Sequence, residues 1–149
     1  MKKVIGITGS IGSGKSYAVD IFKKICKEKR INAIFLDVDD IRRNILSKEN
    51  IDRNQLNQKI YNDKNAMEEY KQFINPKIKK YLNEQISKND GVIFIEWALL
   101  IEDNLYDIVD SIIMIYCKEE IQIKRLENGD LGKESIMKRI KMQLTNEQK

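Results

Sequence analysis

Residues 4–16 of the chain read VIGITGSIGSGKS, an apolar run that leads into a glycine-rich turn and a Lys-Ser pair. Residues 9–16 match the phosphate-binding P-loop pattern, Gly-x-x-x-x-Gly-Lys-Ser. Glycines let the backbone curl until its N–H groups converge on phosphate oxygens, and the helix that follows presents its positive end to the same anion. The motif stands between an expected strand and an expected helix, so we predict a nucleotide-binding loop rather than a chance glycine-rich turn.

The residues of this loop have separate expected roles. Lys15 can reach the β- and γ-phosphates as a point charge, and the Ser16 hydroxyl can ligate Mg²⁺. ATP and Mg²⁺ are therefore the predicted cofactors. The predicted nucleotide-binding set is Gly9, Ser10, Ile11, Gly12, Ser13, Gly14, Lys15, Ser16 and Tyr17.

Four short apolar runs predict the strands of one sheet, at residues 4–8, 33–36, 92–95 and 112–116. Each run is nearly continuous rather than alternating, which is typical of parallel strands covered on both faces. Helical periodicity between the runs implies right-handed βαβ units. We therefore predict an α/β fold of the P-loop NTPase type, a three-layer αβα sandwich with a parallel sheet and a helical lid and acceptor region.

The predicted helices follow from apolar spacing and from one proline. Ala18, Ile21, Phe22 and Ile25 mark the helix after the P-loop, and further helices are expected to start near residues 118 and 133. A long helical segment carries Met67, Tyr70, Ile74 and Ile78 as its apolar positions. Pro76 lies inside that segment and should kink or divide it near Asn75.

Length and composition bound the answer further. The 149 residues fit a single domain, residues 1–149, with acceptor-side helices at about 41–88 and a lid at about 124–139. The absence of histidine excludes histidine bases and ligands, and the isolated Cys26 and Cys117 are expected to be free, buried thiols. The net charge of +4 is spread along the chain, which suits small anionic substrates better than nucleic acid. No run approaches a membrane span, so a cytoplasmic location is expected.

Carboxylates stand at the ends of two predicted strands. Ligands of an open parallel sheet bind beyond the carboxyl ends of its strands, where Asp37, Asp39 and Glu96 should therefore gather. Asp39 is our candidate for the base that orients the acceptor, and Ser16, Asp37 and Glu96 are the candidate metal ligands. Helix capping is an equally acceptable reading for Asp37 or Asp40.

Basic residues surround a short polar break at residues 128–132. A kinase needs cations that close over the transferred phosphoryl group and exclude water. We assign that role to Arg125, whereas a solvated helical face accounts for the others, which are Lys124, Lys133, Lys138 and Arg139.

With these elements in place, the chain resembles the dephospho-CoA kinase family. The resemblance is carried by seven short elements in the same order and with roughly the same spacing. They are the P-loop stretch at residues 7–16, Asp37-Val38-Asp39, the Arg-x-x-Leu at residues 53–56, Asn75-Pro76-Lys77-Ile78, Ala98-Leu99-Leu100-Ile101-Glu102, the Gln-x-x-Arg-Leu at residues 122–126 and the Arg-Ile-x-x-Gln at residues 139–143.

The resemblance implies phosphorylation of the ribose 3′-hydroxyl of dephospho-CoA, with ATP-Mg as donor. It gives Asp39 the role of catalytic carboxylate and Arg125 a role in the lid. The chain departs from the family pattern at Asn75, where the family has His, and at Ala98, where it has Pro. It also has Gly129 in place of the lid arginine and is short between residues 46 and 52.

Two other functions fit parts of the pattern. A nucleoside or nucleotide monophosphate kinase would share the layout and differ in the acceptor pocket. A nucleotide-binding regulatory protein with little transfer would be compatible with the missing lid arginine. A GTPase switch is disfavoured because neither Asp-x-x-Gly nor Asn-Lys-x-Asp occurs in the chain.

Overall fold

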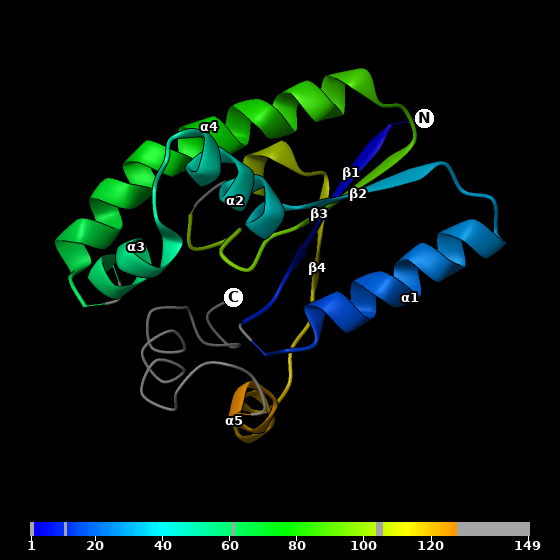
Figure 1. The fold of residues 1–149 in the computed structure, drawn as a ribbon. Helices are drawn as coiled ribbons and strands as arrows, with labels where there is room; N and C mark the ends of the chain where they lie inside the picture. The colour runs from blue at the N-terminus through cyan, green and yellow to red at the C-terminus, as the bar shows by residue number, and fades with distance from the viewer. Residues whose placement is uncertain (1, 11, 61, 104–105, 128–149) are drawn as a thin grey trace.

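The computed structural model describes residues 2–10, 12–60, 62–103 and 106–127. The chain alternates strands and helices around one sheet (Figure 1). Among the described residues, no helix is both long and apolar enough to cross a membrane. The elements are β1 (Lys3–Thr8), α1 (Lys15–Glu28), β2 (Ala33–Asp37), α2 (Val38–Lys48), α3 (Arg53–Ile60), α4 (Lys64–Lys88), β3 (Val92–Glu96), the 3₁₀-helix η1 (Tyr106–Ile108), β4 (Ser111–Met114) and α5 (Glu119–Glu127).

The four strands form one parallel sheet in the order β2-β3-β1-β4. Helix α1 lies on one side of the sheet, and α2, α3 and α4 lie on the other (Figure 1). This arrangement confirms the predicted α/β fold with a parallel sheet. All four predicted strands are present, with bounds that differ by at most two residues from those expected.

Each face of the sheet has its own core because successive side chains of a strand point to opposite faces. On the α4 face, Ile93 and Ile95 of β3 pack with Ile74 and Ile78 of α4 and are fully buried. On the α1 face, Phe94 of β3 belongs to a second cluster that contains three further buried residues, Ile7, Val19 and Cys26. Burial on both faces explains why the strands read as continuous apolar runs.

Helix α1 forms where it was predicted but packs through a different stripe. Val19 and Cys26 are buried and Phe22 packs beside them, whereas Ile21 and Ile25 are 41% and 39% exposed. The buried stripe also follows helical spacing, so two apolar stripes compete in this sequence. The prediction that Ile21 and Ile25 belong to the apolar face of the helix that packs on the sheet was therefore wrong.

Helix α4 is one uninterrupted helix of 25 residues, and Pro76 does not divide it. The side chain of Pro76 is exposed, and so is Gln72, whose carbonyl loses its partner to the proline. That carbonyl can therefore bond to water instead. The expected helix start near residue 118 is confirmed by α5, and the one near residue 133 lies outside the described residues.

Candidate active site

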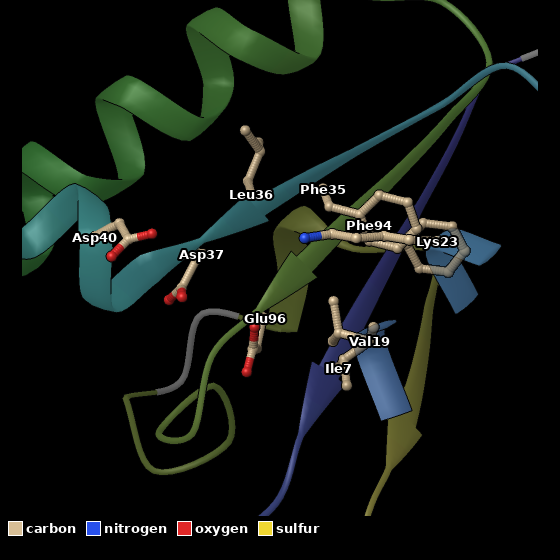
Figure 2. A pocket seen from close by; sticks show the side chains of 9 residues that line it. All are labelled: Ile7, Val19, Lys23, Phe35, Leu36, Asp37, Asp40, Phe94 and Glu96. Atoms are coloured by element: carbon tan, nitrogen blue, oxygen red, sulfur yellow. The ribbon is translucent and has the colours of Figure 1, made fainter. Parts of the chain in front are cut away.

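The carboxyl ends of β1, β2 and β3 meet at one edge of the sheet. Glu96 pairs in register with Ile7 on one side and with Asp37 on the other. Figure 2 shows the Asp37 and Glu96 carboxylates extending from their strands into the same space, at the end of a pocket of about 150 Å³. The P-loop begins one residue after β1 ends, so these acids stand beside it.

The P-loop follows a path that side chains at its glycines would obstruct. A Cβ on Gly9 would lie 2.2 Å from the carbonyl oxygen of Ile115. Gly14 has a φ of 100°, and a Cβ there would meet the Arg125 guanidinium at 3.1 Å. The loop is therefore packed between the end of β4 and helix α5, in a conformation that its glycines permit.

Polar groups inside the loop fit a phosphate ligand. Ser13 Oγ is buried and has no hydrogen-bond partner among the described residues, so a donor suited to an anion remains available. Lys15 Nζ donates to the carbonyl oxygen of Ser10 at 3.4 Å. Tyr17, also predicted to contact nucleotide, is 74% exposed, and Ile11 lies outside the described residues.

Ser16 and Glu96 come together as the candidate metal ligands would. Ser16 Oγ donates a hydrogen bond to Glu96 Oε1 at 3.3 Å. Burial raises the pKa of Glu96, the negative charge of Asp37 raises it further, and the Ser16 hydrogen bond and the Lys15 charge lower it. Hydroxyl and carboxylate oxygens are the donors that Mg²⁺ prefers, so the set fits this ion.

Asp37 and Asp39 belong to different elements, because β2 ends at Asp37 and α2 begins at Val38. The strand ends at Asp37, whose Oδ1 accepts a hydrogen bond from the Asp39 N–H at 2.8 Å and caps α2. The capping reading of Asp37 is thus confirmed. Burial raises the pKa of Asp37, while the capping bond from Asp39 lowers it.

Asp39 occupies the first turn of α2, just beyond the carboxyl end of β2. Its side chain is 64% exposed, and its Oδ1 accepts from Arg42 Nη1 at 3.1 Å. Asp40 makes the equivalent pair with Arg43, also at 3.1 Å. Asp39 is therefore held by a cation yet open to a ligand.

Arg125 reaches the P-loop from α5. Its Nη1 donates to the carbonyl oxygen of Gly12 at 3.3 Å and lies 3.8 Å from Cys117 Sγ. Cys117 is half-buried rather than buried, whereas Cys26 is buried as expected, and both are free thiols. The other basic residues proposed for this region are Lys124, which is exposed on α5, and Lys133, Lys138 and Arg139, which lie outside the described residues.

Comparison with known proteins places this geometry in a family. The family model described as dephospho-CoA kinase matches residues 37–149. The chain belongs to the dephospho-CoA kinase family. A dephospho-CoA kinase of Campylobacter jejuni (strain RM1221) is 31% identical over 168 residues, spanning 100% of this chain and 84% of the relative.

One further dephospho-CoA kinase and one solved structure are also similar to the chain. A dephospho-CoA kinase of Fusobacterium nucleatum is 31% identical and covers 98% of this chain and 83% of its own length. The crystal structure of TT1252 from Thermus thermophilus superposes with a TM-score of 0.82 at 21% identity, covering 98% of this chain and 82% of that one. That likeness shows the fold.

The sequence reading missed one buried polar cluster of this family member. Asp103, in the segment after β3, lies beside Lys71 of α4 and within the electrostatic reach of Arg42 of α2. These residues are far apart in the sequence and belong to none of the motifs above, so no local pattern could have grouped them.

Proposed function

We propose that the chain transfers the γ-phosphate of ATP to the ribose 3′-hydroxyl of dephospho-CoA. Family membership supports the reaction and the acceptor. The observation that carries the assignment of residues is the juxtaposition of the P-loop with carboxylates at the ends of β2 and β3. We also infer a cytoplasmic location, in keeping with free cysteines.

In this proposal Asp39 acts on the acceptor. Its exposed carboxylate orients the 3′-hydroxyl and takes up its proton as the hydroxyl oxygen bonds to the γ-phosphorus. The bond from the γ-phosphorus to the bridging β,γ-oxygen breaks, and ADP leaves. Arg42, which donates a hydrogen bond to Oδ1 of this carboxylate, keeps it directed for that contact.

Lys15 and Arg125 act on the donor. Lys15 sits at the start of α1, where it can leave the Ser10 carbonyl and contact the β- and γ-phosphates. Arg125 stands over Gly12 and Gly14 and can neutralise charge on the transferred group from the side of α5. Both cations favour the transition state because negative charge is spread over the phosphoryl oxygens.

Mg²⁺ would be held by Ser16 and Glu96, with Asp37 behind Glu96 as a second acid. The ion would neutralise phosphate charge when bound. In the part of the chain that the structure describes, no three acidic or cysteine side chains cluster closely enough to hold a metal. Phosphate oxygens and water are therefore expected to complete its coordination.

A comparison of acceptors tests the proposal. Purified protein is incubated with ATP-Mg and equal concentrations of dephospho-CoA, adenosine, AMP, CMP or UMP, and ADP release and the product mass are followed. We expect dephospho-CoA to be the best acceptor by at least about tenfold, the discrimination that buried polar contacts to a cognate substrate readily supply. A nucleoside monophosphate that is tenfold better would identify the chain as a nucleotide kinase instead. ATP binding without transfer to any acceptor would favour a regulatory nucleotide-binding protein.

A further inference from the structure

Asp103 is a buried carboxylate that joins three elements on the acceptor side of the sheet. Its side chain is 1% exposed, and its Oδ1 lies 3.5 Å from Lys71 Nζ of α4. Burial raises the pKa of Asp103, while the charges of Lys71 and Arg42 lower it. A buried carboxylate without cations around it would be strongly destabilising, so these two cations account for its presence.

Arg42 connects this buried charge to the surface. Its side chain is 23% exposed, and its Nε is buried without a hydrogen-bond partner among the described residues. Its Nη1 instead donates to Asp39 Oδ1 at 3.1 Å. Arg42 thus pairs with Asp39 and also lies within the electrostatic reach of Asp103.

The Arg42–Asp39 contact would be weak without an anchor. Exposed ion pairs on a helix contribute little to stability, because both side chains lose rotamer freedom to form them. Asp40 and Arg43 form such a pair on the same helix, with both side chains more than half exposed. Arg42 differs because its Nε is buried and because its charge acts on the buried Asp103 carboxyl, whose pKa it lowers.

We propose that Asp103 is a positioning residue that holds Arg42 in place and, through it, the Asp39 carboxylate that receives the acceptor. This inference rests on the role proposed above for Asp39. Lys71 of α4 forms an ion pair with Asp103, so the buried carboxylate has a second cation beside it. Asp103 itself contacts neither substrate.

A double-mutant cycle on the intact chain tests the proposal. The kcat for CoA formation and the KM for ATP are measured for Asp103→Asn, Arg42→Gln, Asp39→Asn and the two double variants that include Asp39→Asn. Asp107→Asn is the matched control, because Asp107 belongs to the same region after β3 and pairs with Lys79 of α4 at 3.3 Å, away from Arg42. Thermal melting establishes that each variant is folded.

We expect Asp103→Asn and Arg42→Gln each to lower kcat by about 10- to 10²-fold, since misplacing a reacting group by about 1 Å has effects of that size. The KM for ATP should stay within about twofold, because the P-loop is untouched. Asp107→Asn should match the wild type. When Asp39→Asn is already present, neither Asp103→Asn nor Arg42→Gln should lower kcat further. If the role of Asp103 were purely structural, its substitution would lower kcat in both backgrounds.

Several outcomes would overturn the proposal. A normal kcat in Asp103→Asn, or an equal additional loss in the Asp39→Asn background, would show that Asp103 does not act through Asp39. If Asp103→Asn fails to fold, Arg42→Gln decides, and its normal kcat rejects the anchor. A normal kcat in Asp39→Asn would also reject Asp39 as the base. If only Asp39→Asn lowers kcat, the proposed function holds and the role proposed for Asp103 is rejected.

Discussion

At the residue scale, Lys15 is the side chain whose removal should separate catalysis from folding. It lies at the first position of α1 and donates a hydrogen bond to the Ser10 carbonyl, while the loop's path depends on glycines. We predict that Lys15→Ala lowers kcat by at least about 10³-fold, the size of effect seen when a charge that stabilises the transition state is lost. The melting temperature without nucleotide should be unchanged.

Melting curves with and without ATP-Mg, together with turnover, measure both effects. Lys24→Ala, an exposed lysine on the same helix, is the control and should behave like the wild type. Normal turnover and full stabilisation by ATP-Mg in Lys15→Ala would remove the P-loop from the mechanism.

The roles of residues that belong to a sequence motif could be predicted from sequence. The roles of residues that depend on where a strand ends could not. The P-loop pattern identified the turn, the helix start and the Ser16 hydroxyl because its glycine spacing permits one backbone path. For Asp37 the sequence leaves both metal binding and helix capping open, since both use a carboxylate. The hydrogen bond from the Asp39 N–H to Asp37 decided for capping, and this also changed how Asp39 is presented.

At the element scale, α5 carries the cation that covers the P-loop. Arg125 Nη1 bonds to the Gly12 carbonyl, so α5 and the loop should move together when phosphate binds. We predict that Arg125→Ala lowers kcat by about 10²-fold or more, as expected for a guanidinium that neutralises transition-state charge. The KM for dephospho-CoA should change little. The control is Lys124→Ala, because Lys124 is exposed and adjacent on the same helix. An equal loss of kcat in that variant would show that the effect comes from general surface charge.

Helices were predictable in position but not always in orientation. The strand bounds followed from apolar runs, and apolar spacing placed a helix over residues 67–78, which lie within α4. Helix α1 has two apolar stripes, and the one containing Val19 and Cys26 faces the sheet because it lies opposite Ile7 and Phe94. That choice depends on the neighbouring layer and is invisible in α1 alone.

At the scale of the whole molecule, Glu96 should favour function at a cost in stability. Its pKa is raised above the ordinary 4.5 mainly by burial and then by Asp37, so the folded protein holds this proton more tightly than the unfolded chain. The free energy of unfolding therefore falls as pH rises through the window just above pH 4.5, and the ionised group remains unfavourable at neutral pH.

We predict that Glu96→Gln raises the free energy of unfolding at pH 7 and flattens its decline above pH 4.5. The same variant should need about 10- to 10²-fold more Mg²⁺ for half-maximal activity, because it loses a charged ligand of the ion. Urea unfolding at several pH values and Mg²⁺ titration of the rate measure the two effects. Lower stability at pH 7 with unchanged Mg²⁺ dependence would show that Glu96 is structural.

The sequence does not predict which charged residues from distant segments come together in the fold. Arg42, Lys71 and Asp103 come from two helices and the segment after β3, and only the packing of α2 and α4 on one sheet face brings them together. The family elements, by contrast, lie in order along the chain and were recognised from it. This difference explains why the reaction class was predicted and the anchor behind Asp39 was not.

The central claim is that Asp39 directs phosphoryl transfer to dephospho-CoA. Its most direct test is the single-turnover rate of CoA formation, measured in wild type and Asp39→Asn with saturating ATP-Mg and dephospho-CoA. The amide keeps the shape of the side chain but cannot take up the acceptor proton, so we predict a fall of about 10²–10⁴-fold with ATP affinity unchanged. The wild type should form a product phosphorylated at the ribose 3′-position. A near-normal rate in Asp39→Asn, or no CoA from the wild type, would contradict the claim that Asp39 directs this transfer.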